Sequence, residues 1–507
     1  MLGISVKNLS ISTPRRELLR SVSFNVQEGR RVALLGRNGG GKTSLLDVIA
    51  SAAGHGNAPS HLELNGSVSV TPGARVAVMP QEIALSVGGE VGTYIEARSS
   101  ARLLAFPGYS RAVSAVLDGL RLGPELVSRP LSTLSGGEAT RVALAGVLVS
   151  EADFILLDEP TNNLDFASQE FLVEWFRGSQ NGSLVVTHDR VFLDAAVDEI
   201  LEIDEAGHGL NHFGGNYSAF AEGKRIEFEA RVREHEERED RRAALAESAR
   251  KLERRAQTFQ STSQNDYYRR RGKKVASKAV AQKTRLEKQM QAIAAPAPPA
   301  RPRIPVPYLV SRRGVAVDAR HISFNYEVRL PIVSDVSIRL SFGERLALVG
   351  PNGTGKSTLI QLLIGQLLPR AGKVIRADGL RTAYLRQRPA MPGGPTSLVD
   401  FARGIVGGSE DEVRALLGKV LFADTLHLRV DQVSLGELRR IELAALLTGG
   451  PDLLVLDEPT NHLDIPSLDM VEEAINEYPG ALIVVTHDRR FLQAINAGRV
   501  IEMPGGE

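Results

Sequence analysis

Short apolar runs recur along the chain and form its most regular hydrophobic pattern. RVALL at 31–35, FILLD at 154–158 and SLVVT at 183–187 are apolar almost throughout and do not alternate with polar residues. Runs of this length are typical of strands buried on both faces of a parallel sheet. A glycine-rich loop and the helix-forming segment SLLDVIA at 44–50 follow the first run. The pattern therefore predicts an α/β fold.

The same runs occur a second time in the C-terminal half. RLALV at 345–349, LLVLD at 453–457 and ALIVVT at 481–486 follow one another in the order of their N-terminal counterparts. A repeat of this kind indicates two copies of one domain. We expect the first copy at 1–211, the second at 314–507, and a unique linker at 212–313 that contains a proline-rich stretch.

The linker has the pattern of a long helix that turns back on itself. From Glu222 to Phe259 charges alternate, proline is absent and the only glycine is Gly223. Two apolar seams, one on each arm, are suited to packing against each other. The first seam consists of Leu245, Ala249, Leu252, Ala256 and Phe259, and the second of Val275, Ala279, Leu286, Met290 and Ile293. We predict an antiparallel α-helical hairpin whose first arm extends roughly 50 Å.

Composition and charge narrow the classes of protein that fit. The 507 residues include no cysteine, which excludes disulfides and thiolate metal sites and fits a reducing compartment. No run of about 18 apolar residues occurs, so the sequence predicts no membrane-spanning segment. The formal net charge of +1 conceals an uneven linker, in which residues 222–249 carry a net −2 and residues 250–288 a net +10.

The basic part of the linker includes NDYYRRRGKKVASK at 265–278, near the predicted turn of the hairpin. Its charges are nearly all of one sign and are interleaved with tyrosines, a combination suited to the phosphates and exposed bases of RNA. An acidic protein or a membrane surface could also attract these charges, but neither accounts for a rigid projecting arm. The candidate RNA-binding residues are Tyr267, Tyr268, Arg269, Arg270, Arg271, Lys273, Lys274 and Lys278.

Two glycine-rich loops have the composition of phosphate cradles. GRNGGGKT at 36–43 and GPNGTGKS at 350–357 each lie between a strand and a helix, where backbone N–H groups can face phosphates. In each loop the lysine would reach the β and γ oxygens of ATP, and the following hydroxyl would join a Mg²⁺ shell. The candidate residues are Gly36, Asn38, Gly39, Gly41, Lys42, Thr43 and Ser44 in the first loop, and Gly350, Asn352, Gly353, Gly355, Lys356, Ser357 and Thr358 in the second.

An acidic pair ends the second apolar run of each half, and a histidine follows the third run. Acids at the carboxyl end of a parallel strand lie where ligands bind, so we expect the aspartates to hold Mg²⁺ or its water shell. The neighbouring glutamates are placed to polarise the attacking water, and the histidines to contact the γ-phosphate. These residues are Asp158 and Asp457, Glu159 and Glu458, and His188 and His487.

LSGGE at 134–138 precedes the helix-forming segment ATRVALAGVLV at 139–149. Serine and glycine N–H groups at the start of a helix favour an anion, because the helix dipole is positive there. Since each domain already has a loop for its own nucleotide, this second anion site suits the γ-phosphate of a nucleotide held by the other domain. The matching stretch is VSLGE at 433–437, in which Leu435 replaces the first glycine.

This combination of motifs resembles the ABC ATPases, in which two such domains close head to tail over two ATP molecules. The resemblance covers both halves and implies a Mg²⁺-dependent ATP hydrolase in which a glutamine from each half, Gln81 or Gln387, joins the metal and nucleotide contacts. The resemblance assigns residues from both domains to each ATP site. Site one joins Lys42, Gln81, Asp158, Glu159 and His188 to Ser434, Gly436 and Glu437. Site two joins Lys356, Gln387, Asp457, Glu458 and His487 to Ser135, Gly136 and Gly137.

The two halves also differ in ways that predict unequal sites. LSGGE and VSLGE correspond to the signature segments of the ABC ATPases. Leu435 alters the second of these, which serves site one. Tyr326 in FNYEV is placed to stack on adenine, whereas the matching stretch SISTPRREL at 10–18 offers no aromatic residue. In the first half, either an arginine stacks on the adenine or the adenine is held loosely.

Within that superfamily the chain resembles the ABC-F proteins. The resemblance is carried by the tandem layout, DEPTNNLD at 158–165, DEPTNHLD at 457–464, FGGNYSAF at 213–220 and the charged helical linker. It implies a cytoplasmic monomer with paired ATPase domains that occupies the ribosomal E site when it holds ATP. The linker would then reach along the P-site tRNA toward the peptidyl-transferase centre of the large-subunit rRNA, and hydrolysis would permit release.

Members of that family divide into translation factors and antibiotic-resistance proteins. The short segment between Gln81 and Ser135 leaves little room for the extra arm of some housekeeping members, and the linker is extended and basic. These features favour antibiotic resistance by ribosome protection, with a housekeeping translation factor as the alternative. Two further classes stay open: the ATPase subunit of a transporter with separate membrane proteins, and a nucleotide-binding module without turnover.

Overall fold

The computed structural model describes the chain apart from residues 1, 15, 58, 80–88, 100–103, 105–108, 163, 205–207, 262–276, 278–280, 283, 287–302, 308–311, 327–331, 352, 388–393, 395, 422–427, 462 and 504–507. The chain forms two compact units, one of Met1–Tyr217 with Pro302–Glu507 and one of Ser218–Arg301. The first unit contains both copies of the repeated domain, which we call domain 1 and domain 2.

Domain 1 is built on a largely parallel sheet, as the apolar runs predict. Its strand order is β5-β6-β7-β3-β8-β9, and only the pairing of β8 with β9 is antiparallel. A second, antiparallel sheet has the order β2-β1-β4. The strands are β1 (Gly3–Thr13), β2 (Arg16–Gln27), β3 (Arg31–Leu35), β4 (Glu63–Val70), β5 (Val76–Val78), β6 (Phe154–Asp158), β7 (Gly182–Val186), β8 (Glu199–Ile203) and β9 (Leu210–Gly214).

Domain 2 repeats this arrangement without a counterpart of β9 among its described residues. Its parallel sheet has the order β14-β15-β16-β12-β17, and its antiparallel sheet the order β11-β10-β13. The strands are β10 (Val315–Phe324), β11 (Val333–Ser341), β12 (Arg345–Val349), β13 (Ala371–Arg376), β14 (Thr382–Leu385), β15 (Leu453–Asp457), β16 (Ala481–Val485) and β17 (Arg499–Glu502).

Each domain also contains several helices. In domain 1 they are α1 (Lys42–Ala52), α2 (Val91–Glu96), α4 (Tyr109–Gly119), α5 (Gly136–Leu148), α6 (Phe166–Gly178) and α7 (Arg190–Ala196), with the 3-10 turns η1 (Pro124–Ser128) and η2 (Leu131–Thr133). In domain 2 they are α10 (Lys356–Ile364), α11 (Leu398–Val406), α12 (Glu410–Val420), α13 (Leu435–Thr448), α14 (Ile465–Glu477) and α15 (Arg489–Ala494), with the turn η3 (Val430–Gln432).

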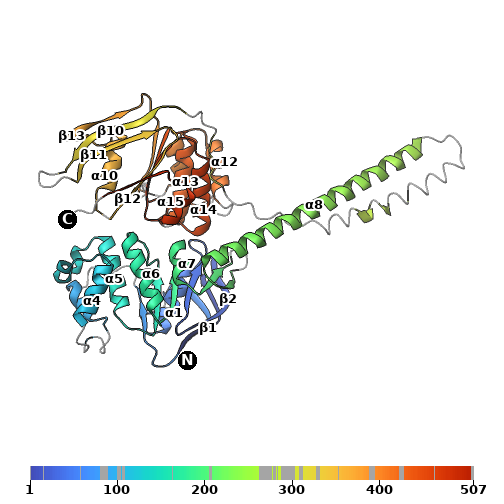
Figure 1. Ribbon diagram of the computed structural model, residues 1–507. Coiled ribbons are helices and arrows are strands. Elements are labelled where there is room, and N and C mark those ends of the chain that lie inside the picture. The colour runs from blue at the N-terminus through green and yellow to red at the C-terminus, as the bar shows by residue number, and fades with distance from the viewer. Residues whose placement is uncertain are drawn as a thin grey trace. The chain divides into compact units, whose positions relative to one another are not determined.

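Strand β15 shows why the central runs are apolar at every position. Leu453 and Val455 pack into a core shared with α10 and the antiparallel sheet, whereas Leu454 and Leu456 pack into a core shared with α13, α14 and α15. Figure 1 shows α10 on one side of the parallel sheet of domain 2 and the other three helices on the opposite side. Because successive side chains point to opposite faces, a strand with a core on each face has no polar position.

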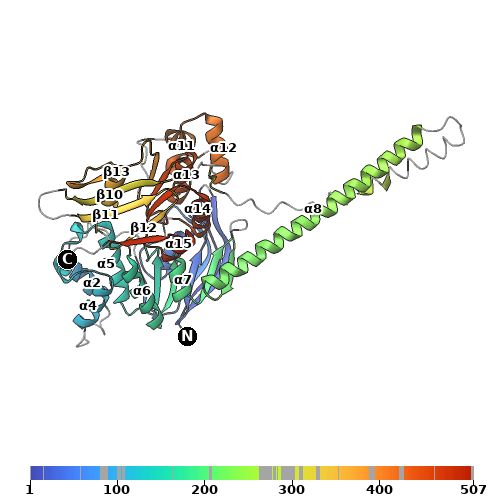
Figure 2. The ribbon, with the colours of Figure 1, turned by 45° about the horizontal axis from the view of Figure 1, so that its top comes forward.

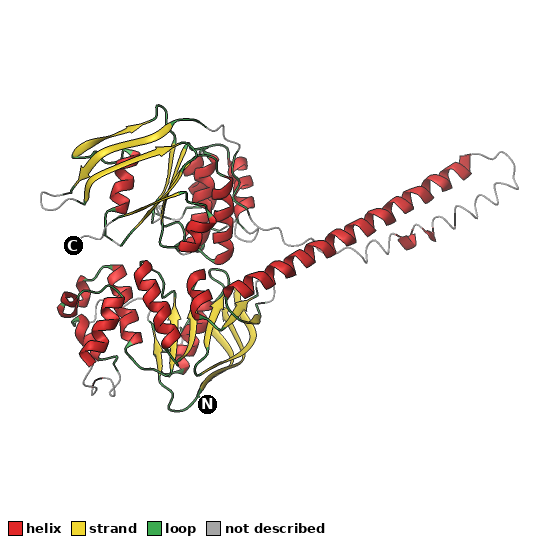
Figure 3. Cartoon of the chain, viewed as in Figure 1, coloured by secondary structure: helices red, strands yellow, loops and turns green. Residues whose placement is uncertain are grey.

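The linker begins with α8 (Tyr217–Ser261), a helix of 45 residues (Figures 2 and 3). It starts five residues before the predicted Glu222, and its length corresponds to about 67 Å. Ion pairs one helical turn apart run along its exposed surface, among them Arg225 with Glu229 at 2.6 Å and Lys251 with Glu247 at 2.7 Å. Such pairs stabilise a helix that has little apolar surface to bury. The predicted tip lies outside the described residues, and the return arm lies largely outside them, so the hairpin stays a prediction.

The helices of the described part of the chain include none that is both long enough and apolar enough to cross a bilayer.

Candidate active site

Each glycine-rich loop connects an inner strand of the parallel sheet, β3 or β12, to the helix that follows it. Gly41 and Gly355 cap α1 and α10 with left-handed backbone, at φ 94° and 89°. A side chain at Gly355 would also come within 2.5 Å of Ile332, so glycine is required there by space as well. The lysines fold back into their loops: Lys42 Nζ donates to the carbonyl of Gly36 at 2.7 Å, and Lys356 Nζ donates to that of Gly350 at 2.7 Å.

A hydroxyl and a carboxylate meet at the end of each loop. Thr43 Oγ1 donates to Asp158 Oδ2 at 2.6 Å, and Ser357 Oγ donates to Asp457 Oδ2 at 2.9 Å. Tyr384 donates to the same oxygen of Asp457 at 3.1 Å. Hydroxyl and carboxylate oxygens are ligands that Mg²⁺ prefers, so the residues brought together fit this ion.

The two glutamates next to these aspartates have an unusual backbone. Glu159 and Glu458 adopt left-handed conformations, with φ 51° and 50°. Their N–H groups donate to the carbonyls of Val186 at 2.7 Å and Val485 at 2.9 Å, which holds this conformation in place. Left-handed backbone is uncommon at a glutamate and is concentrated at functional sites.

A histidine from the next strand faces each glutamate. His188 Nε2 lies 3.2 Å from Glu159 Oε1, and His487 Nε2 lies 3.3 Å from Glu458 Oε1. Neither contact is aligned as a hydrogen bond, and among the described residues both ring nitrogens of each histidine are buried without a hydrogen-bond partner. Burial lowers the pKa of His188 to about 3 and of His487 to about 4, so both rings are neutral near pH 7. Buried imidazoles without partners are suited to binding a ligand.

Burial raises the pKa of both glutamates to about 8. The side chain of Glu458 is 8% exposed and that of Glu159 is 26% exposed, so we expect the stronger effect at Glu458. Near pH 7 the nucleotide-free protein therefore holds a proton on Glu458 that the unfolded chain has released.

Stability without nucleotide should consequently fall as the pH rises from about 5 to about 8, and this loss should be smaller in Glu458→Gln. Glutamine has no carboxyl proton to release, whereas the wild-type Glu458 must release one as the pH rises. Melting temperatures measured at about pH 6 and pH 8.5 should differ by a few °C less in the variant than in the wild type. Equal pH dependence in the two proteins would contradict the buried, protonated Glu458.

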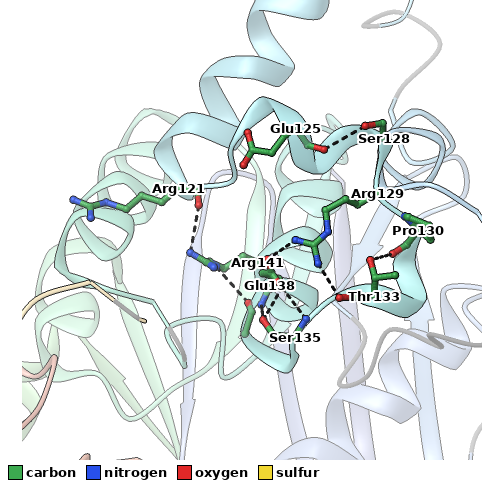
Figure 4. Close-up of polar contacts among 10 residues, drawn as sticks. Arg121, Glu125, Ser128, Arg129, Pro130, Thr133, Ser135, Glu138 and Arg141 are labelled. Carbon is green, nitrogen blue, oxygen red and sulfur yellow. Dashed lines mark hydrogen bonds and ion pairs between the residues drawn. The ribbon is translucent and has the colours of Figure 1, made fainter. Parts of the chain in front are cut away.

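Arg129 and Glu138 position the signature serine of domain 1 (Figure 4). Ser135 caps α5, and Glu138 Oε2 accepts hydrogen bonds from the backbone N–H and the Oγ of Ser135, both at 2.7 Å. Arg129 Nη1 donates to Glu138 Oε1 at 2.9 Å, and Arg129 Nη2 donates to the carbonyl of Thr133 at 2.8 Å. Burial opposes ionisation of Glu138, but the bonds to Ser135 and Arg129 outweigh it and lower its pKa.

Domain 2 has the same cap, but the arginine nearest its glutamate is on the helix itself: Arg440 lies 4.0 Å from Glu437. Ser434 caps α13, and Glu437 Oε2 accepts from its N–H at 2.9 Å and from its Oγ at 2.7 Å. Leu428 stands at the position that matches Arg129. The S-x-x-E spacing in both signatures could have revealed these capping boxes from the sequence, but nothing in it distinguishes Arg129 as the partner of Glu138.

The structure brings all residues assigned to site two around one cavity of about 980 Å³. Domain 2 supplies Lys356, Gln387, Asp457, Glu458 and His487, and domain 1 supplies Ser135, Gly136 and Gly137. Ser357 and Thr358 line the same cavity. Tyr326 OH lies 3.3 Å from Thr358 Oγ1, and the tyrosine is 56% exposed, so its ring is accessible to a base.

The site-one cavity, of about 590 Å³, is lined by domain 1. Its walls include Asn38, Gly39, Gly41, Lys42, Thr43, Ser44, Asp158 and Glu159, but not His188, Ser434, Gly436 or Glu437. Instead, Asp464 of domain 2 contacts the loop, because its Oδ2 accepts a hydrogen bond from the Asn38 N–H at 3.0 Å. Arg16 also lines this cavity and donates to the carbonyl of Gly39 at 2.6 Å, so an arginine lies beside the nucleotide loop of this site. Gln81 and Asn352 lie outside the described residues.

Ion pairs also join the two domains beside these cavities. Arg190, two residues after His188, lies 3.5 Å from Asp469 and makes a double hydrogen bond with Glu472 on α14. Arg489, at the matching position of domain 2, lies 2.7 Å from Glu170 on α6. Arg190 and Glu472 are largely buried, whereas Asp469 is half exposed and the second pair is more than half exposed. The sequence predicts neither pair, because the partners lie in different domains.

Comparison with known proteins identifies the fold and the family. The ABC transporter family profile matches residues 19–162 and 333–461. The tylosin resistance ATP-binding protein TlrC of Streptomyces fradiae is 32% identical over 94% of this chain and 93% of its own length. ABC transporter F family member 2 of Arabidopsis thaliana is 29% identical over 99% of this chain and 77% of its own. A solved structure of RNase-L Inhibitor matches with a TM-score of 0.60 at 20% identity, over 98% of this chain and 88% of that one, and supports the fold.

The repeated domains, the paired motifs and these full-length similarities agree with one another. The chain belongs to the ABC-F family of tandem ABC ATPases.

Proposed function

We propose that this protein is a ribosome-binding ATPase that confers antibiotic resistance by ribosome protection. In its ATP-bound form it occupies the E site, and its linker reaches toward the P-site tRNA and the peptidyl-transferase centre. The observation that carries the proposal is the linker itself: a charged, exposed helix of 45 residues leads from domain 1 to a strongly basic segment. A rigid arm ending in basic and aromatic residues is suited to RNA at a distance from the ATP sites.

The ATP sites would switch the protein between its ribosome-bound and released forms. In site two, Lys356 neutralises the phosphates and neutral His487 binds a γ-phosphate oxygen. Glu458 first releases the proton that it holds without nucleotide, and its carboxylate then orients and deprotonates the attacking water. Mg²⁺, held by Ser357, Gln387 and Asp457, would offset the charge on the phosphates. Ser135 comes from the other domain, so a γ-phosphate in this site favours the closed pair and its loss favours opening. Site one would work in the same way after Ser434 approaches its loop.

The choice of resistance over housekeeping translation rests on similarity and on the linker. The relative from Streptomyces fradiae, 32% identical along nearly its whole length, is a tylosin resistance protein. A housekeeping translation factor is the second candidate, because ribosome binding by itself fits both.

Cosedimentation with ribosomes tests the proposal. The variant Glu159→Gln with Glu458→Gln should pellet with ribosomes when ATP is present and remain in the supernatant without it, because ATP would stay bound and the domains closed. Replacing Arg269, Arg270 and Arg271 with alanine should weaken this binding and reduce the slope of log affinity against log salt by about 2 to 3.

A matched triple variant controls for loss of charge alone. Arg225, Arg231 and Arg238 lie on α8 and pair with glutamates of the same helix, so their replacement with alanine should leave ribosome binding within about twofold. Failure of the double glutamine variant to pellet with ATP would remove the ribosome proposal and favour a transporter subunit or another partner. Ribosome binding without any change in drug susceptibility would favour the translation factor.

A further inference from the structure

Arg439 is a fully buried arginine on α13 that none of the ATP-site assignments uses. It is 1% exposed, and its two terminal nitrogens donate hydrogen bonds to the carbonyl oxygens of Arg386 and Gln387, in the loop after β14. Glu442, one turn further along α13, lies 3.5 Å from Nη1. The guanidinium therefore ties the backbone of this loop to the helix.

Burial of this charge suggests a specific role. Replacing a buried ion pair by apolar residues of similar size is often neutral or stabilising, so packing alone does not require an arginine here. An aliphatic side chain could fill the space, but it could not hold two adjacent carbonyl groups at once. Only arginine offers a planar fork with parallel N–H donors for such a pair.

The position of Arg439 links parts of the two ATP sites. Gln387 lines the cavity of site two, whereas α13 begins at Ser434, the signature serine assigned to site one. A helix moves as a rigid element over so short a distance, so a shift of Ser434 would be transmitted to the loop that carries Gln387. In domain 1 the matching residue is Thr140, which donates to the carbonyl of Gly136 within its own helix at 2.9 Å. Its side chain is too short to make a comparable tether.

We propose that Arg439 is a positioning residue that fixes the backbone of Gln387 to α13, and thereby couples site two to the signature serine of site one. The inference rests on the roles proposed above for Gln387 and Ser434. Domain 2 is then the half of the protein that transmits the nucleotide state of one ATP site to the other.

Hydrogen exchange in the nucleotide-free, full-length protein tests the tether without relying on catalysis. In Arg439→Met the amides of residues 382–387 should exchange about tenfold faster than in the wild type, while those of β16 exchange at an unchanged rate. Arg386→Met is the matched control, because it removes a positive charge from the same loop and leaves both carbonyl acceptors in place. Its exchange should stay within about twofold of the wild type.

Mg²⁺ titration of the ATPase tests the effect on site two. In a Glu159→Gln background, where site one is disabled, Arg439→Met should raise the Mg²⁺ concentration for half-maximal activity by about fivefold, and Arg439→Lys should give an intermediate value. In a Glu458→Gln background, Arg439→Met should raise the KM for ATP at site one by about threefold, because Ser434 loses its link to the loop.

Several results would overturn the inference. Wild-type exchange at 382–387 in Arg439→Met would show that there is no tether, and faster exchange throughout domain 2 with an unchanged Mg²⁺ requirement would show a purely structural role. An unchanged site-one KM would remove the coupling. If Arg439→Met does not fold, wild-type exchange and Mg²⁺ requirement in Arg439→Lys would overturn the inference. Absence of ATPase activity in the wild type would instead refute the proposed roles of the ATP-site residues. The hydrogen-exchange result would still show whether Arg439 tethers the loop to α13.

Discussion

Replacing Glu159 and Glu458 together with glutamine is expected to reduce steady-state ATP hydrolysis by at least about 100-fold. Glutamine keeps the size of the side chain and can still donate a hydrogen bond, but it cannot accept a proton from the attacking water. Because burial raises the pKa of both carboxyls to about 8, neutral glutamine imitates their protonated form and should leave folding intact. Phosphate release under saturating ATP and Mg²⁺ measures the effect.

The single variants separate the two sites. Each should retain part of the activity, and the division need not be equal. Among the described residues, Arg129 supports the serine segment of domain 1 that lines site two, and Arg439 holds Gln387 of the same site. ATP binding, followed with a fluorescent nucleotide, should remain within about threefold of the wild type in all three variants. Wild-type hydrolysis in the double variant would show that neither glutamate acts on the water.

Replacing Arg190 with alanine is expected to lower stability by about 3 kcal/mol or more. The arginine side chain is 7% exposed and that of Glu472 is 13% exposed, so the substitution leaves a carboxylate largely buried without its cation. Since Glu472 belongs to the other domain, the loss should weaken the contact between the domains. The midpoint of thermal unfolding in the absence of nucleotide should fall by several °C.

The matching pair in domain 2 provides the control. Arg489 and Glu170 are 53% and 59% exposed, so Arg489→Ala should cost no more than about 1 kcal/mol. Adding Glu472→Ala to Arg190→Ala should recover part of the lost stability, because it removes the unpaired carboxylate. Equal losses in Arg190→Ala and Arg489→Ala would contradict the difference in burial.

Local pattern was enough to predict the two α/β domains and the strand, loop and helix units in which the candidate residues lie. The apolar runs become central strands because β15 and its counterparts have a core on each face. The lysines, aspartates and glutamates lie next to these strands, so their positions at the sheet edge follow from the chain itself. The first arm of the linker was predicted on the same grounds, since helix-stabilising ion pairs connect residues three or four apart.

Residues that depend on a distant partner could not be predicted in this way. Asp464 reaches the loop of the other domain at Asn38, and Arg190 reaches Glu472, although nothing in the sequence marks these as neighbours. Likewise, only the fold shows that Arg129 is the partner of Glu138.

The sequence by itself determined the repeated strand, loop and helix units and the residues at their ends, because backbone geometry fixes which neighbours along the chain share a site. Only the tertiary structure decided that Asp464 contacts the loop of the other domain at Asn38, and which of two matching positions is buried. Those contacts depend on how whole domains pack, and spacing along the chain carries no information about them. The difference between Arg439 and Thr140 is of this kind: the sequence shows two residues, and the fold shows that one of them holds Gln387.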